Sequence, residues 1–153
     1  MAGLSAERLS AYMKDGYLLL EDVLSSADLQ PLIDDINAGI DRRAREAFSE
    51  GRLNTRFEDE PFDRRLTRIC ETMVDSSEVE KAVTGKRLKT AGMFALITHT
   101  AILDIVESVI GPEILAHPQF NCQAKMPNEA QSKIPWHQDL GFLHPDAEET
   151  FMV

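Results

Sequence analysis

Two residues near the C-terminal end of the sequence, His137 and Asp139, have the types and the spacing of metal ligands. If this stretch is extended, both side chains point to the same face, because successive side chains of a strand alternate between its two sides. An imidazole and a carboxylate on one face suit iron(II), and a triad of two histidines and one carboxylate leaves coordination positions open. The pair would therefore supply two of the three protein ligands that such a site requires.

The third ligand is less apparent. His144 is the other histidine near the pair, but it lies next to Pro145 and would need a tight return of the chain to reach the same ion. A His-x-Asp pattern also occurs by chance, and the alternative interpretation is a half-exposed histidine beside an aspartate that caps a helix. Trp136, which can wall a pocket, and Gly141, which lets the chain turn away, favour the metal site.

An alternating segment precedes this motif. Polar and apolar side chains alternate strictly from residue 119 to residue 126, which is typical of a strand with two different faces. Its polar face includes Asn121, Gln123 and Lys125. This face is either the solvent side of an edge strand or the wall of a cavity in which Lys125 meets a carboxylate. By pattern alone, the solvent-exposed interpretation is favoured.

The rest of the chain is predicted to be mainly helical up to residue 112 and β-structured after it. Apolar residues recur at three- and four-residue steps over residues 29–50, 66–74, 88–97 and 102–110, as in amphipathic helices. Gly111-Pro112 should end the last helix, because glycine accepts a positive φ and proline cannot continue the helix. We expect a short buried strand at residues 17–20, after the Asp15-Gly16 turn, and further strands around residues 137 and 150–153.

The composition indicates a soluble globular protein, with 43% hydrophobic and 27% charged residues, and its 153 residues suit one domain. The net charge of -10 argues against nucleic acid or an anionic membrane as the main partner. The first residues lack the basic start and apolar core of a signal peptide, and no apolar run is long enough to cross a bilayer. Cys70 and Cys122 are expected to be buried reduced thiols, which predicts a cytoplasmic location.

One local cluster of basic residues is a candidate for binding an anionic substrate. It consists of Arg64, Arg65 and Arg68. The surrounding segment carries a similar number of acidic residues, so the favoured interpretation is a nearly neutral, solvated helical surface.

Three stretches of the sequence resemble the phytanoyl-CoA dioxygenase family of iron(II)- and 2-oxoglutarate-dependent oxygenases. Residues 12–25 look like the family's entry strand and first helix cap, and residues 102–114 look like the helix and Gly-Pro turn that lead into its barrel. The third stretch is the most specific. There, Lys125-Met126-Pro127 and Trp136-His137-Gln138-Asp139 are similar to the family's Lys-x-Pro and Trp-His-x-Asp patterns.

The resemblance implies an α+β fold, in which a helix-rich N-terminal part leads into the first strands of an incomplete double-stranded β-helix of the jelly-roll or cupin type. His137 and Asp139 would be two iron ligands, and Lys125 would help to hold 2-oxoglutarate. The reaction would convert 2-oxoglutarate to succinate and carbon dioxide while a small organic substrate is hydroxylated. The candidates for the substrate pocket are Asn121, Gln123 and Trp136.

The same resemblance predicts that residues 1–153 form one domain that is the N-terminal portion of a dioxygenase. Residues 1–112 would be mainly helical, and residues 113–153 would carry the first barrel strands. The family's distal histidine and its arginine for 2-oxoglutarate are not found after Asp139, so we expect the 153-residue chain alone to be inactive. The alternative is a non-catalytic helical binding or interaction module that keeps only the front half of the family fold.

Overall fold

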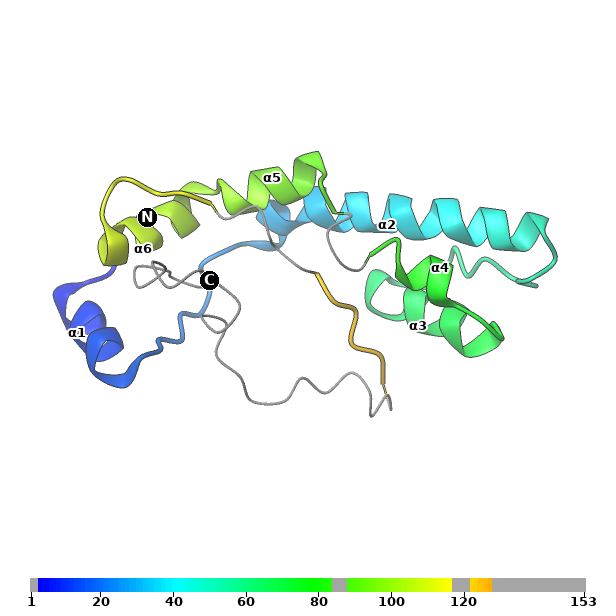
Figure 1. The fold of residues 1–153 in the computed structure, drawn as a ribbon, viewed down its shortest axis with the longest axis horizontal. Coiled ribbons are helices and arrows are strands. Elements are labelled where there is room, and N and C mark those ends of the chain that lie inside the picture. Colours follow the sequence, from blue (N-terminus) through cyan, green and yellow to red (C-terminus); the bar gives the residue numbers. More distant parts are fainter. Residues whose placement is uncertain (1–2, 84–87, 117–121, 128–153) are drawn as a thin grey trace, which may run out of the picture. The chain divides into compact units, whose positions relative to one another are not determined.

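The computed structural model describes residues 3–83, 88–116 and 122–127. These residues form six helices (Figure 1), namely α1 (Ala6–Asp15), α2 (Ser26–Ser49), α3 (Phe62–Thr72), α4 (Ser77–Glu80), α5 (Ala91–Ile97) and α6 (Thr100–Ile110). They divide between two compact units. Of the described residues, 3–25 and 97–116 belong to the first unit, and 26–83, 88–96 and 122–127 belong to the second.

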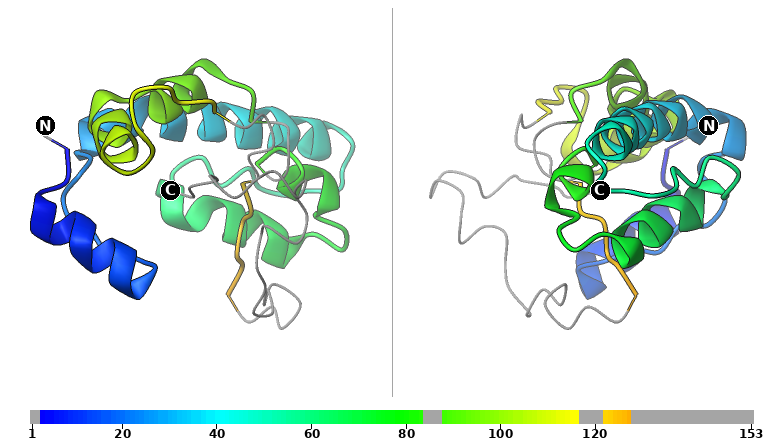
Figure 2. Two further views of the ribbon diagram at one scale, coloured as in Figure 1. Left: turned by 60° about the vertical axis from the view of Figure 1, so that its left-hand side comes forward. Right: turned by 90° about the vertical axis from the view of Figure 1, so that its right-hand side faces the viewer.

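The core of the second unit lies between α2, α3 and α4. Helix α2 contacts both other helices, which contact each other, and α3 and α4 lie on the same side of α2 (Figures 1 and 2). Full burial of one aliphatic side chain contributes roughly 1.5–3 kcal/mol, so this cluster supplies the main driving force for the packing. Its buried members are Ile40, Ala44, Ala47, Leu53, Ile69, Val79 and Val83.

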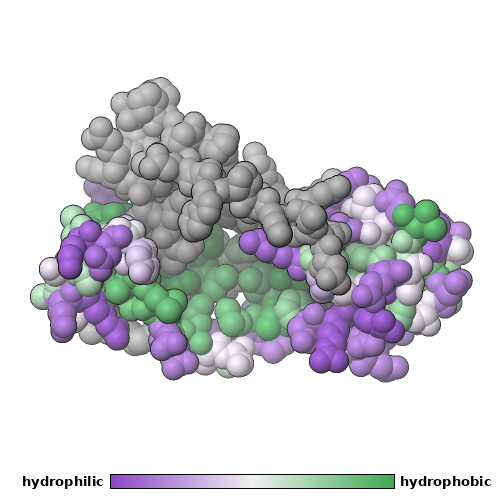
Figure 3. Space-filling model, turned by 90° about the horizontal axis from the view of Figure 1, so that it is seen from below, coloured by the Kyte–Doolittle hydropathy of each residue, from purple (hydrophilic) through white to green (hydrophobic). Residues whose placement is uncertain are grey.

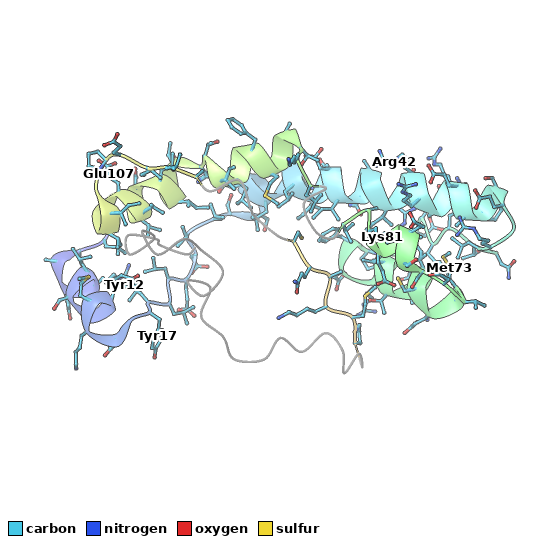
Figure 4. The ribbon with its side chains drawn as sticks, in the orientation of Figure 1. Tyr12, Tyr17, Arg42, Met73, Lys81 and Glu107 are labelled. Atoms are coloured by element: carbon cyan, nitrogen blue, oxygen red, sulfur yellow. The ribbon has the colours of Figure 1, made fainter. Side chains whose placement is uncertain are left out.

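The ends of α2 and α3 show which boundary predictions are correct. Helix α2 ends at Ser49, close to the predicted limit of residue 50. Gly51 beyond it has a φ of +72°, and the backbone N–H of Arg52 donates to the carbonyl of Ala47 over 2.9 Å. Helix α3 ends two residues earlier than its apolar pattern predicted, because the backbone of Met73 is already extended. The exposed Val74 lies beyond it. Figure 4 labels Met73 at this end and Lys81 at the end of α4.

Helix α1 was not predicted, although its two ends carry recognisable signals. The Ser5 hydroxyl accepts a hydrogen bond from the backbone N–H of Arg8 over 3.3 Å, which is the usual role of an N-cap serine. At the other end, Gly16 has a φ of +78° and donates its N–H to the carbonyl of Tyr12 over 2.8 Å. The Asp15-Gly16 turn is therefore the C-terminal cap of a helix. Figure 4 labels Tyr12 on α1 and Tyr17 just beyond it.

The predicted α+β fold, with the first strands of a double-stranded β-helix, is wrong for the part of the chain that the structure describes. Residues 17–20 form no strand, and Tyr17 and Leu19 are 74% and 79% exposed instead of buried. Residues 122–127 contain an isolated bridge residue, Cys122, and no strand. An alternating pattern sets the side-chain periodicity only, whereas a sheet needs a partner strand for its backbone N–H and C=O groups. The strands predicted around residues 137 and 150–153 lie outside the described residues.

In the first unit, the N-terminal segment is attached to α6. The backbone N–H of Leu4 donates to the hydroxyl of Ser108 over 2.8 Å, and that hydroxyl donates to the carbonyl of Asp104 over 2.7 Å. Helix α6 ends at Ile110, where the Gly111-Pro112 pair predicted its end. The His99 imidazole accepts the N–H of Ala101 over 3.3 Å at its start, and Gly111 closes its end with a φ of +86°.

In the second unit, α5 begins directly against α2. The Asp35 carboxylate accepts the backbone N–H of Gly92 over 2.7 Å. A Cβ atom at Gly92 would lie 2.5 Å from both the carbonyl carbon and the carbonyl oxygen of Pro31. These two atoms are part of the backbone of α2 and cannot rotate away as the end of a flexible side chain would. Only glycine therefore permits this close approach.

Several large hydrophobic side chains reach the surface, and Figure 3 shows such hydrophobic areas in green on one face of the molecule. The exposed ones include Met13, Tyr17, Leu19, Phe48, Phe94 and Leu115. Among the described residues, no single helix is long and apolar enough to cross a membrane, although α5 and α6 together, with a bend between them, reach the necessary length and hydropathy.

Gly92→Ala should lower the free energy of unfolding by about 1–3 kcal/mol, because the new methyl group overpacks the contact between α5 and the backbone of α2. Urea denaturation followed by circular dichroism measures this change. Gly39→Ala is the matched control. Its Cβ would lie 3.4 Å from the carbonyl oxygen of Ala82, and alanine raises helix propensity by up to about 1 kcal/mol, so stability should stay equal or increase. Equal destabilisation by both variants would contradict the close-approach argument.

Candidate functional site

The predicted site residues are only partly within the described structure. Gln123 and Lys125 are described, whereas the predicted iron ligands His137 and Asp139 lie outside the described residues, and so do Asn121, Trp136 and His144. Within the described ranges, no group of three or more His, Cys, Asp or Glu side chains is placed to hold a metal ion. The metal site therefore stays a prediction from the sequence.

The segment of residues 122–126, which carries Lys125, has the two-faced character that its alternation predicted. Cys122, Ala124 and Met126 are half-buried, while Gln123 and Lys125 are exposed. Ala124 packs against the core cluster, so the apolar face of the segment is turned toward the helices of the second unit. The alternation thus exists without a β-sheet, because a helical surface takes the place of the neighbouring strand.

An open pocket of about 220 Å³ lies between this segment and the helices. Ile40 and Val83, both almost fully buried, contribute to its aliphatic lining. Asp63 and Lys125, both exposed, bring opposite charges to it. The remaining lining residues are Ile36, Phe62, Leu66, Thr67, Cys122, Gln123, Ala124 and Met126. The pocket is therefore an aliphatic hollow with ionic groups at its exposed edge.

Carboxylates neutralise Arg65 and Arg68, as the prediction of a nearly neutral segment implied, but Arg65 is buried and does not belong to a solvated surface. Arg65 is buried, and its guanidinium donates to the carboxylate of Asp41 over 2.9 Å. Arg68 pairs with Glu71 over 3.1 Å on the same helix, and Arg64 is exposed. Because Arg65 is already bonded inside the second unit, the three arginines do not present a common face to an anion.

Two arginines act on the Asp41 carboxyl. The hydrogen bond from Arg65, together with that from Arg45 over 2.7 Å, outweighs the opposing effect of burial and holds the pKa of Asp41 below its ordinary value. The Arg65 guanidinium also donates to the backbone carbonyl of Arg56 over 3.3 Å. This network links α2, α3 and the loop between them.

Cys70 and Cys122 are half-buried instead of buried as predicted, and neither belongs to a disulfide bond. Burial raises the pKa of the Cys122 thiol. A raised pKa keeps the thiol protonated at neutral pH and therefore a poor nucleophile. Cys122 thus contributes to the pocket lining as an apolar group.

The contacts that hold the segment of residues 122–126 could not be inferred from the sequence. The Thr67 hydroxyl of α3 donates to the Met126 sulfur over 3.7 Å. No periodicity or motif connects these two residues, which are 59 positions apart. Asp63 likewise shows nothing in the sequence that would assign it to the same pocket as Lys125.

The comparison with known families identifies the family to which the chain belongs. The family model described as phytanoyl-CoA dioxygenase (PhyH) matches residues 12–153, a range that includes both the Lys-x-Pro and the Trp-His-x-Asp patterns. The chain belongs to the phytanoyl-CoA dioxygenase family. No curated protein and no solved structure matches the chain.

The Asp41 network makes the free energy of unfolding depend on pH in the acid range. A lowered pKa in the folded state contributes stability above the unfolded pKa of about 3.9, and this contribution is lost as the pH falls through the lower folded pKa. Asp41→Asn should therefore lose about 1.5 kcal/mol at pH 7 and show a flatter decline of unfolding free energy below about pH 4. Urea denaturation over this pH range measures both effects.

Glu50→Gln is the control for Asp41→Asn, because its ion pair with Arg52 has side chains that are 57% and 44% exposed. Such a pair contributes roughly 0–1 kcal/mol. If the two variants lost the same stability at pH 7, or if Asp41→Asn kept the acid sensitivity of the wild type, the assigned role of the Asp41 network would be wrong.

Proposed function

We propose that the protein is an iron(II)- and 2-oxoglutarate-dependent dioxygenase that hydroxylates a small organic substrate. The observation that carries this proposal is the family match, because it spans nearly the whole chain and includes the two patterns whose residues have the appropriate chemistry. The net charge of -10 is consistent with a small molecule as the substrate and argues against nucleic acid.

The proposed metal ligands are His137 and Asp139. Their neutral imidazole nitrogen and anionic carboxylate oxygen form the mixed donor set that suits iron(II), and the carboxylate partly neutralises the charge of the ion. When bound, the metal would supply the activation of oxygen. The role of these two residues is to hold it and to leave positions open for the other ligands. This donor set fits the implied metal in chemistry.

Lys125 is proposed to bind a carboxylate of 2-oxoglutarate. Its ammonium is a compact cation on a flexible stem, which suits an anionic oxygen. Its exposed position on the polar side of the segment leaves it accessible to a ligand, and the half-buried residues on either side anchor the backbone that carries it. Gln123 shares this exposed side and is proposed to orient the substrate, together with Asn121 and Trp136.

His137→Ala and Asp139→Ala should each weaken cobalt(II) binding, because cobalt(II) takes nitrogen and oxygen ligands and reports its coordination by visible absorption. Even the loss of a group that only supports a ligand weakens metal binding by roughly 10- to 100-fold, so the loss of a ligand itself should have at least that effect. The titration uses the full chain, and the absorption bands give the affinity of each variant.

The matched control for His137→Ala is His144→Ala, since both remove one imidazole from the same part of the sequence. We expect the His144 variant to bind cobalt(II) as tightly as the wild type. Equal affinity in all four proteins would contradict the metal site and favour the non-catalytic binding module. A loss of affinity in His144→Ala would instead mean that His144 is a ligand.

Lys125→Ala should weaken 2-oxoglutarate binding by roughly 10- to 100-fold, because a hydrogen bond to a charged group contributes about 1.5–3 kcal/mol. Calorimetric titration of 2-oxoglutarate into the chain in the presence of manganese(II) measures the dissociation constant. Binding is measured directly, because Lys125 is assigned to the binding of 2-oxoglutarate and not to the reaction. Lys89→Ala, which removes another exposed lysine, should leave binding unchanged, and equal effects of the two substitutions would refute the assignment.

A further inference from the structure

Lys125 belongs to a segment that has no regular hydrogen-bonded structure of its own, since residues 123–126 lie in neither a helix nor a strand. A side chain that binds a ligand needs a fixed backbone, because a displacement of the ammonium by about 1 Å weakens its contacts. The fixation of Lys125 must therefore come from the packing of the half-buried side chains next to it.

The half-buried side chains differ in how firmly they can hold the segment. Ala124 offers one methyl group to the core cluster, and a methyl contact has no preferred direction. Met126 also lines the pocket, and its sulfur accepts the hydrogen bond of the Thr67 hydroxyl over 3.7 Å. A thioether is a weak acceptor, but this contact is directional and therefore selects one position along the segment.

The position of Met126 determines the side on which Lys125 lies. Alternate residues of an extended segment point to opposite faces, so a shift by one residue would turn Lys125 toward the helices and Met126 toward solvent. In the observed arrangement, Met126 is half-buried against the helices and Lys125 is exposed to solvent. Thr67 lies on α3, whose own position is set by the buried Ile69 and by the Arg65–Asp41 pair.

We propose that Thr67 and Met126 are positioning residues that set the register of the segment of residues 122–126 and thereby hold Lys125 at the edge of the pocket. This inference rests on the proposed function, in which Lys125 binds 2-oxoglutarate. Thr67 acts through Met126 and is not itself assigned a contact with 2-oxoglutarate. The helices of the second unit thus place one binding residue of the oxygenase site.

Thr67→Val tests the pair, because valine keeps the shape of threonine and removes the hydroxyl donor. In the full chain, we expect the backbone amides of residues 123–126 to exchange with deuterium roughly 2- to 10-fold faster, which corresponds to the loss of one neutral hydrogen bond. The dissociation constant of 2-oxoglutarate, measured in the presence of manganese(II), should rise by a similar factor. Thr67→Ser, which keeps the hydroxyl, should restore both values.

Thr72→Val is the matched control. Its hydroxyl bonds only to α3 carbonyls, those of Arg68 and Ile69, among the described contacts, so we expect neither the exchange of residues 123–126 nor 2-oxoglutarate binding to change. Equal exchange rates in the Thr67 and Thr72 variants would overturn the positioning role. That role also fails if Thr67→Val speeds exchange and leaves 2-oxoglutarate binding intact while Lys125→Ala weakens it. If Lys125→Ala has no effect, the proposed function of Lys125 fails instead, and the inference fails with it.

Discussion

The burial of the apolar face of α2 by α3 and α4 is the interaction on which the second unit depends. Ile40 of α2, Ile69 of α3 and Val79 of α4 are each at most 1% exposed, so the three helices share one core. The small residues Ala44 and Ala47 are also fully buried there, which allows the helices to approach closely. The segment of residues 122–126 packs against this core and owes its position to it.

Polar contacts around the core restrict how the elements can be arranged. The Arg65–Asp41 pair joins α3 to α2, and its extra bond to the Arg56 carbonyl holds the intervening loop. The Asp35 carboxylate and the absent side chain of Gly92 fix the start of α5 on α2. Hydrophobic burial is non-directional, so these directional contacts select one packing among several that would bury a similar area.

The helical arrangement supports a segment that contains part of one of the sequence patterns of the family. The helices provide a firm surface for the segment that carries Lys125, and that segment precedes the Trp-His-x-Asp pattern in the sequence. Under the proposed function, the helical part is a support for the binding residues and not itself the reacting site. Arg65 and Arg68 of α3 agree with this division, since their charges are paired with nearby carboxylates.

The sequence by itself determined the family, the candidate ligands His137 and Asp139, the approximate limits of α2 and α6, and the two-faced character of residues 122–126. These features are local: helix periodicity, glycine caps and short motifs depend on residues close together in the chain. The tertiary structure decided that residues 17–20 and 122–126 form no strand, that Arg65 is bonded to Asp41, and that Met126 meets Thr67. Such outcomes depend on which distant segments come into contact, and neither a strand partner nor a contact across 59 residues is encoded in a local pattern.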